Sequence, residues 1–254
     1  MELSALDHVA AGLAAVAGGA VNALAGGGTL VTFPTLLAIG VPAVGANVTN
    51  TVALSPGYAG GTWGQRADLR GQAGRLRLLG PAAVLGGLVG GMLLLLTGEE
   101  LFRELVPFLI LGASALLAAQ ERIRAVVDRR LGERAGDPSE LWAVVPAFAA
   151  SVYGGYFGAG LGVILLAVLG LVLEDSLTRI NALKQALSFC VNVTAAVYFL
   201  FSGEVVWSVA AVMAVGAVAG GSLGGRLAGR MPAERLRRIV VAIGLVVGVA
   251  ELVR

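Results

Sequence analysis

One lysine, Lys184, lies within an apolar stretch of the 254-residue chain, and every other Lys/Arg side chain is an arginine. Those arginines fall almost entirely between the apolar stretches. A cation near the centre of a membrane-spanning helix costs roughly 2.5–3.5 kcal/mol, so it persists only where something offsets that cost. A bound anion is one such partner. Lys184 is therefore the first candidate for a binding residue.

Amide and hydroxyl side chains accompany this lysine and recur in a second apolar segment nearer the start of the chain. Residues three and four apart share a helix face, and each set has that spacing. The sets are Asn181, Lys184, Gln185 and Ser188 in one segment and Asn47 and Asn50 in the other, with Asn22 from the first segment as a further member. Amides and hydroxyls donate hydrogen bonds to oxygen atoms. The pattern predicts a small, oxygen-rich anion as ligand.

Two glycine clusters precede unusually short apolar segments, 29–40 and 160–173. At about 1.5 Å per residue these segments span about 18–21 Å, against the roughly 30 Å of a hydrocarbon core. Non-helical backbone at membrane depth must be buried in protein or line a wet cavity. Helices starting at about Thr29 and Leu161 would direct free N–H groups and the positive dipole end inward. The predicted site thus includes Gly27, Gly28, Thr29 and Gly160.

Composition places the chain among polytopic membrane proteins. Hydrophobic residues make up 57% and charged residues 13%, with 38 glycines, whereas soluble domains carry about 25% charge. A single cysteine, Cys190, and a single histidine, His8, exclude a disulfide framework and a Cys/His metal cluster. Nucleotide-binding motifs are absent from the sequence. We therefore predict no cofactor, no metal, no nucleic-acid partner and no enzymatic activity.

Hydropathy indicates ten segments, and the arginines orient them. The segments are 8–25, 29–40, 43–63, 78–97, 101–120, 141–157, 160–173, 178–201, 205–225 and 236–252. Arginine-rich connections at 66–77, 121–135 and 226–238 are cytoplasmic by the positive-inside rule, which puts both termini outside. Segments one and two, and segments six and seven, must then each begin and end on one side. Re-entrant hairpins satisfy this parity, and so do two full crossings.

The predicted fold class is an all-α polytopic membrane protein built from two inverted-topology repeats. Each repeat has a re-entrant or half-length helix pair plus three full transmembrane helices. The first repeat covers 1–120, a cytoplasmic arginine-rich linker covers 121–140, and the second repeat covers 141–254. Gly26-Gly27-Gly28 aligns with Gly158-Ala159-Gly160, and Ala46-Asn47-Val48 with Ile180-Asn181-Ala182. Short, glycine-interrupted segments at matching positions of inverted halves point to a transporter's binding site.

At these residues the chain resembles the TauE/SafE sulfite exporter family, also called the toluene sulfonate uptake permease family, over almost its full length. The motifs that carry the resemblance are Gly26-Gly27-Gly28 followed by Pro34, Ala46-x-x-Thr49-Asn50, Asn181-Ala182-Leu183-Lys184, Gly203-x-x-x-Trp207 and Gly220-Gly221-x-x-Gly224. The second-half glycine motif departs from a full triple glycine. Whether both short helices contribute equally is therefore open.

The resemblance implies a bacterial or archaeal inner-membrane carrier for sulfur-containing anions such as sulfite, sulfoacetate or organosulfonates. The expected mechanism is alternating access around a central anion site, with export favoured by an inside-negative potential. Partners are the small anion and the lipid bilayer, with a homodimer left open. An anion channel, and a helper subunit without a substrate of its own, are the alternatives.

Structural explanations compete with each site assignment. Glycine-rich membrane segments commonly serve close helix packing, and membrane asparagines often join helices by hydrogen bonds. Lys184 lies six residues into its segment and could reach the cytoplasmic interface instead of a central site. These alternatives make different predictions about where the lysine ammonium lies.

Overall fold

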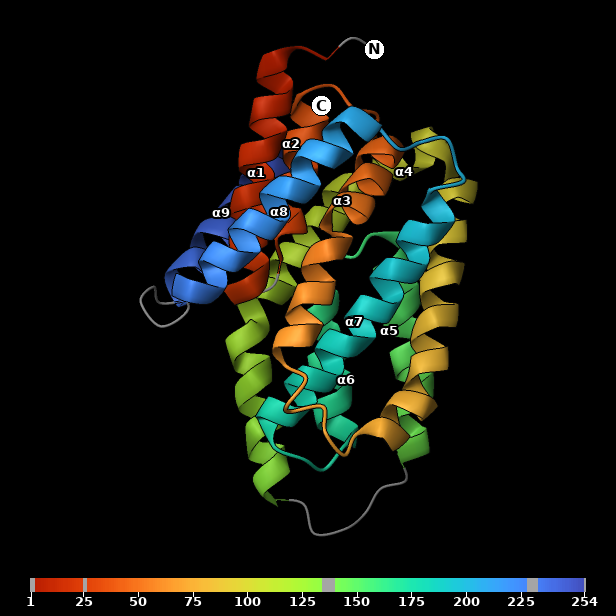
Figure 1. Ribbon diagram of the computed structural model, residues 1–254, viewed down its shortest axis with the longest axis vertical. Helices are drawn as coiled ribbons and strands as arrows, with labels where there is room; N and C mark the ends of the chain where they lie inside the picture. The colour runs from red at the N-terminus through yellow and green to blue at the C-terminus, as the bar shows by residue number, and fades with distance from the viewer. Residues whose placement is uncertain (1–2, 25–26, 134–139, 228–232, 254) are drawn as a thin grey trace.

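Helices dominate the computed structural model (Figure 1), which describes residues 3–24, 27–133, 140–227 and 233–253. No β-strand occurs within those ranges. The elements are α1 (Ala5–Leu24), α2 (Thr29–Ala38), α3 (Ala43–Gly64), α4 (Ala73–Glu133), the 3₁₀ turn η1 (Glu140–Ala143), α5 (Val144–Tyr156), α6 (Leu161–Val172), α7 (Leu177–Phe199), α8 (Trp207–Leu227) and α9 (Ala233–Val253). The predicted all-helical class is confirmed.

A turn at Gly98 divides α4 into two helical arms. Its backbone has φ 75° and ψ 170°, a conformation that glycine adopts without steric cost. The second arm continues to Glu133, so the predicted loop at 121–135 is wrong through residue 133, and the linker 121–140 begins as helix. Arginine, glutamate and alanine favour helix there. Val127 also packs on α6, where Gly170 leaves room for it, since a Cβ at Gly170 would lie 2.2 Å from Val127 Cγ1.

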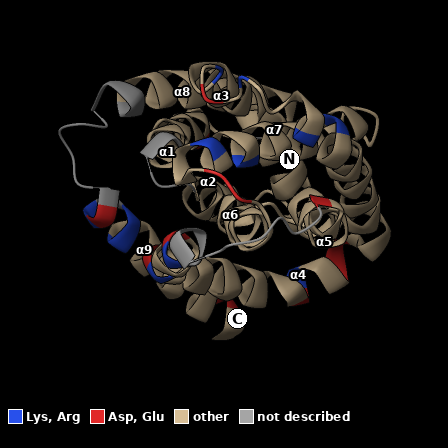
Figure 2. Cartoon of the chain, turned by 90° about the horizontal axis from the view of Figure 1, so that it is seen from below, with Lys and Arg blue, Asp and Glu red and all other residues tan. Residues whose placement is uncertain are grey.

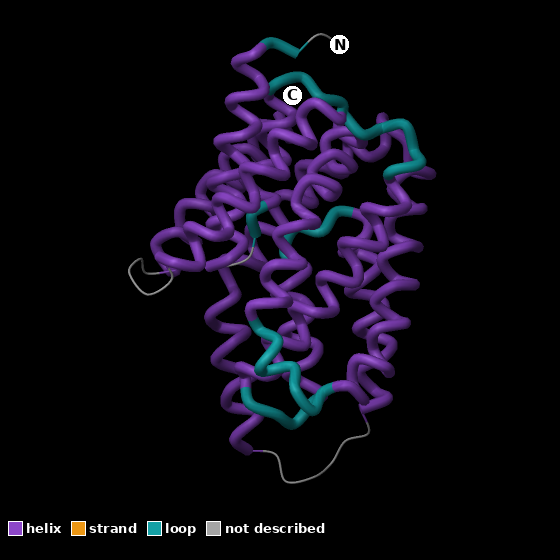
Figure 3. The backbone as a smooth tube through the Cα atoms, viewed as in Figure 1, coloured by secondary structure: helices purple, strands orange, loops and turns teal. Residues whose placement is uncertain are grey.

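The two short helices predicted from the glycine clusters are present. α2 has 10 residues and α6 has 12, which is about 15 and 18 Å of helix. They begin at Thr29 and Leu161, as expected. In the view from below, α2 and α6 lie inside the ring formed by the other helices (Figure 2). The chain leaves helical geometry just before each of them, near mid-height inside the bundle rather than at its ends (Figure 3).

Glycines bring two pairs of helices into backbone contact. On α4, a Cβ at Gly90 would lie 2.0 Å from the Val152 carbonyl oxygen of α5. On α8, a Cβ at Gly220 would lie 1.9 Å from the Val16 carbonyl oxygen of α1. Packing of small residues is the usual source of helix association in lipid, where no hydrophobic force draws helices together. Each pair joins an early part of the chain to a later one.

The outer surface of the bundle is apolar. Large hydrophobic side chains are exposed on several helices, among them Leu6, Leu96, Phe108, Val215 and Val246. By length and hydropathy alone, two described helical stretches, Ala73–Arg129 and Leu177–Phe199, could cross a membrane. Asn47, Thr49, Asn50 and Ser188 are instead buried. The buried residues are mostly apolar as well, but so apolar an exterior is unlike the surface of a soluble protein.

Charged residues mark the ends of the helices. The start of α1 and the end of α9 lie near one end of the molecule, and the connections α3–α4 and α6–α7 lie near the opposite end (Figure 1). The third arginine-rich connection, 226–238, is only partly described. Arg237, at its α9 end, forms an ion pair with Glu121 of α4 at 2.6 Å. The side of the membrane on which each end lies stays a prediction.

Candidate functional site

A cavity of about 280 Å³ lies where both short helices begin. Its lining comes from six helices and from the break before α6. The lining residues are Asn22, Gly27, Thr29, Tyr58, Gln65, Gln120, Arg124, Gly158, Ala159, Gly160, Gly162, Val163, Leu166, Leu177, Thr178, Asn181, Lys184, Gln185 and Ser188. At about 30 Å³ per water molecule, this volume suits a small solute with some water.

Lys184 projects into this cavity from α7. Its Nζ donates to Asn181 Oδ1 at 2.8 Å, and it lies 3.8 Å from the position that a Cβ on Gly162 would take. The ammonium therefore sits beside the first turn of α6. Asn181 in turn donates to Gln65 Oε1 of α3 at 2.9 Å. Lys184 and residues of both glycine breaks therefore line one cavity.

The starts of α2 and α6 contribute backbone to the same cavity. Gly158 and Gly160 have φ of 80° and 81°, so the chain turns there in a way that side chains with a Cβ resist. Most first-turn N–H groups already donate to carbonyls of the glycine breaks, as Leu30 does to Gly27 and Leu161 to Gly158. Each helix start therefore offers the cavity chiefly the positive end of its dipole. Gly27, Thr29 and Gly162 bring both first turns to the cavity wall.

The described lining is positively charged. It contains Lys184 and Arg124 but no aspartate or glutamate. Neither cation has an ion-pair partner among the described residues, whereas Arg75, Arg179 and Arg237 each have one. Two cations and two helix starts without a neutralising carboxylate favour a bound anion.

Buried polar atoms without a partner gather at this site. Among the described residues they are Asn47 Oδ1, Gln120 Oε1 and Ser188 Oγ, and Gln120 and Ser188 both line the cavity. A buried polar group left unsatisfied costs about 1–3 kcal/mol. The serine hydroxyl can donate to a ligand oxygen, as predicted from its place on the lysine face of the helix.

Most of the predicted site residues line the cavity, but three do not. Asn50 instead accepts a hydrogen bond from Thr32 Oγ1 at 2.5 Å, one turn along α2 from the cavity. Asn47 donates to the Tyr156 carbonyl oxygen at 2.8 Å and joins α3 to α5. Gly28 packs against α1, since its Cβ would lie 2.2 Å from the Gly18 carbonyl oxygen. Asn47 and Asn50 thus hold helices in place, the competing explanation considered above.

Five polar lining residues were missed: Tyr58, Gln65, Gln120, Arg124 and Thr178. Tyr58 and Gln65 follow the polar face of their segment toward its end, and the same helical periodicity could have found them. Gln120 and Arg124 lie where α4 continues beyond its apolar stretch. Gln120 is the last residue of the predicted segment 101–120, whereas hydropathy assigns Arg124 to the connection beyond it, so the sequence held no signal that Arg124 lies on a helix face.

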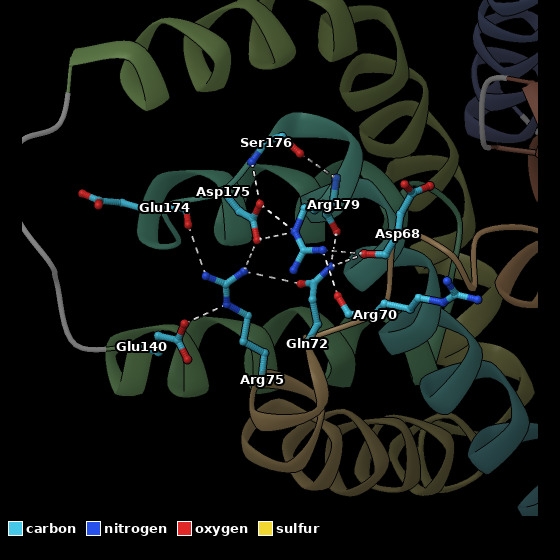
Figure 4. A network of polar contacts seen from close by, with 9 residues as sticks. All are labelled: Asp68, Arg70, Gln72, Arg75, Glu140, Glu174, Asp175, Ser176 and Arg179. Atoms are coloured by element: carbon cyan, nitrogen blue, oxygen red, sulfur yellow. Dashed lines mark hydrogen bonds and ion pairs between the residues drawn. The ribbon is translucent and has the colours of Figure 1, made fainter.

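An ion-pair network links the start of α4 to the connection between α6 and α7 (Figure 4). Arg75 of α4 binds Asp175 at 2.5 Å and Glu140 at 2.7 Å. Arg179 of α7 binds Asp175 at 2.9 Å and donates to the Arg70 carbonyl oxygen at 2.9 Å. Partial burial raises the pKa of the Asp175 carboxyl, but hydrogen bonds from both arginines outweigh it and hold that pKa below its usual value. The network ties the α3–α4 connection to the α6–α7 connection.

Aromatic rings pack beyond the cavity along α2. Phe33, one turn after Thr29, lies edge-on to Phe157 with ring centroids 5.3 Å apart and to Phe102 at 6.4 Å. All three rings are buried. Phe102 follows the Gly98 turn, which lies at the opposite end of the first arm of α4 from Arg75. The cluster fills the space between the cavity and that end of the bundle.

A helical bundle with an apolar exterior and a polar, cationic interior cavity is a membrane protein of the transport class, and comparison with known proteins agrees. A "Probable membrane transporter protein" of Haemophilus influenzae is 27% identical over 206 residues, covering 80% of this chain and 78% of that protein. "Probable membrane transporter protein ORF9" of a Sinorhizobium species is 26% identical, covering 93% and 89%. "Probable membrane transporter protein YfcA" of Escherichia coli K12 is 23% identical, covering 92% and 85%.

The chain belongs to the sulfite exporter TauE/SafE family, because the sequence model of that family matches residues 11–250. This confirms the resemblance stated from the motifs. No solved structure matches the chain.

Proposed function

We propose that this protein is a secondary transporter that exports small sulfur-containing oxyanions, with the substrate bound between Lys184 and the starts of α2 and α6. The observation that carries the proposal is the cavity itself. It gathers an ammonium group, two helix starts and several amide and hydroxyl groups, and its described lining has no carboxylate. An anion can accept hydrogen bonds from the ammonium, amide N–H and hydroxyl groups together, and the positive ends of both helix dipoles favour it. The family description supplies the sulfur chemistry.

The proposed architecture is a pair of inverted repeats, α1 to α4 and α5 to α9. Equivalent contacts support it. α1 packs on α8, and its counterpart α5 packs on the first arm of α4. The close glycine contacts join the same pairs of helices: Gly220 of α8 approaches Val16 of α1, and Gly90 of α4 approaches Val152 of α5.

In the proposed alternating-access cycle, a different structural feature closes the cavity toward each side of the membrane. The cavity reaches exposed residues Thr178 and Arg124, near the arginine-rich end that we assign to the cytoplasm. The buried cluster around Phe33 closes the opposite side. We propose that rocking of the halves breaks the aromatic cluster while the ion-pair network draws the other mouth shut. An inside-negative potential favours exit of each negative charge by about 2.3 kcal/mol per 100 mV.

Lys184 provides an unusually clean test because it is the chain's sole lysine. An amine-reactive reagent can modify only this side chain and the terminal α-amine. Purified protein is labelled with and without sulfite, sulfate, thiosulfate, taurine or sulfoacetate, and mass spectrometry measures the modified fraction of Lys184. At least one anion should protect Lys184 while the α-amine reacts at an unchanged rate. Equal labelling of Lys184 with and without every one of these solutes would contradict the proposed binding site.

Transport by a carrier is tested in proteoliposomes. Unlabelled anion inside should accelerate uptake of radiolabelled sulfite by wild-type protein, and the Lys184→Ala variant should lose this counterflow. Taurine carries no net charge at neutral pH, so it serves as the control for whether binding depends on the charge of the solute. Electrical conductance without counterflow would instead identify the anion channel considered above.

A further inference from the structure

Among the α4 arginines whose side chains the structure describes, Arg124 is the one that lines the cavity. It follows Gln120 by four residues, so the two share a face of the helix, and both belong to the lining. Arg122 and Arg129 lie on the same arm and are exposed, but they are not part of the lining. The helix that replaces the predicted loop is what brings Arg124 to this place.

Arg124 is also held by no other side chain. Among the described residues it has neither an ion pair nor a hydrogen bond, although Glu121 and Asp128 lie on the same helix. Glu121 is already paired with Arg237 of α9. Arg124 is exposed and Lys184 is half-buried, and both side chains line the same cavity. Their positive charges therefore repel each other.

We propose that Arg124 is a second substrate-binding cation and that, together with Lys184, it makes the site select doubly charged over singly charged oxyanions. The inference rests on the proposed anion site. Electrostatic energy scales with the product of the charges, so a dianion gains twice as much from each cation as a monoanion of the same size. A dianion between the two cations also offsets more of their mutual repulsion than a monoanion does.

The competing explanation is that Arg124 only marks the cytoplasmic end of a membrane helix, like its neighbours. That role does not depend on where the side chain points. Arg122 would then serve equally well, and neither arginine would influence which anion binds. A matched pair of variants on one helix separates the two explanations.

Sulfate and methanesulfonate are suitable probes because both are tetrahedral and they differ by one charge. For each anion, the concentration that halves modification of Lys184 is measured in full-length wild-type protein, Arg124→Gln and Arg122→Gln at fixed ionic strength. Arg124→Gln should raise the value for sulfate about tenfold or more and that for methanesulfonate by less than about threefold. A tenfold change corresponds to about 1.4 kcal/mol. Arg122→Gln should change neither value appreciably.

Three outcomes would count against the proposal, and they are distinguishable. If Arg124→Gln weakens the binding of sulfate and methanesulfonate equally, the site does not select by charge. If Arg122→Gln weakens sulfate binding as much as Arg124→Gln does, Arg124 has no specific role in binding. Either result leaves the proposed transport function intact. Failure of both anions to protect Lys184 in the wild type removes the dianion site, and failure of the whole panel above removes the proposed function as well.

Discussion

Replacing Gly90 with alanine tests the backbone contact between α4 and α5. The added Cβ would lie 2.0 Å from the Val152 carbonyl oxygen and 2.7 Å from the Tyr156 nitrogen. Real Cβ atoms essentially never approach another heavy atom closer than 3.0 Å. Both neighbours belong to the backbone of α5, so no side chain can rotate away. The two helices must move apart.

The size of the effect follows from two opposing contributions. Overpacking of a well-packed interface costs about 1–3 kcal/mol, and an overlap against backbone belongs at the upper end. Alanine regains about 1 kcal/mol because it favours helix over glycine. The net loss is about 2 kcal/mol. At about 2–4 °C per kcal/mol for a chain of this size, the midpoint of thermal unfolding should fall by about 4–8 °C.

The assay is tryptophan fluorescence of detergent-solubilised protein during heating, with Gly112→Ala as control. Gly112 lies on the second arm of α4, and a Cβ there would meet nothing within 4 Å. That variant should melt at the wild-type temperature or up to about 4 °C higher, because only the helix-propensity gain remains. If Gly90→Ala melted at or above Gly112→Ala, the described packing of α4 on α5 would be wrong.

Three further outcomes follow from the site and its surroundings. Arg75→Gln should destabilise the protein by about 1–3 kcal/mol in the same melting assay, since charged hydrogen bonds are lost, whereas exposed Arg77→Gln should change little. The Asp175 carboxyl, whose pKa is lowered in the folded state, contributes stability above its unfolded pKa of about 3.9 and loses it as the pH falls through the lower folded value. The melting temperature of Asp175→Asn should therefore fall less steeply below about pH 4 than that of the wild type. Ser188→Asp places a carboxylate one turn from Lys184 and should abolish anion protection of the lysine, which Ser188→Asn should retain.

Sequence reasoning located the elements well where composition alone determines them. The glycine clusters and the short apolar runs after them predicted helix starts at Thr29 and Leu161, and both were found there. This success has a simple cause. Glycine breaks a helix locally, and the length of an apolar run is visible without knowledge of its neighbours. Lys184 was assigned to a central site for an equally local reason, the cost of a charge in an apolar segment.

The misplaced residues depended on partners in other parts of the chain. Helical spacing put Asn47 and Asn50 on one face of α3 but could not say what covers that face. Thr32 of α2 and the Tyr156 carbonyl of α5 cover it, so these amides join helices. Arg124 was missed for the opposite reason. A helix that leaves the membrane becomes polar while its geometry continues, and hydropathy cannot distinguish it from a loop.

Under the proposed function, the separation of roles within α7 lets one helix both hold the fold and bind an anion. Arg179, near its start, is engaged by a carboxylate and by backbone oxygens, so its charge is satisfied in the resting protein. Lys184, five residues further on, meets only a neutral amide among the described residues. A carboxylate at that point would neutralise the lysine permanently, and a bound anion would then have nothing to gain. The missing carboxylate keeps the site electrostatically unsatisfied when empty, which is the condition for an anion that must bind and also leave.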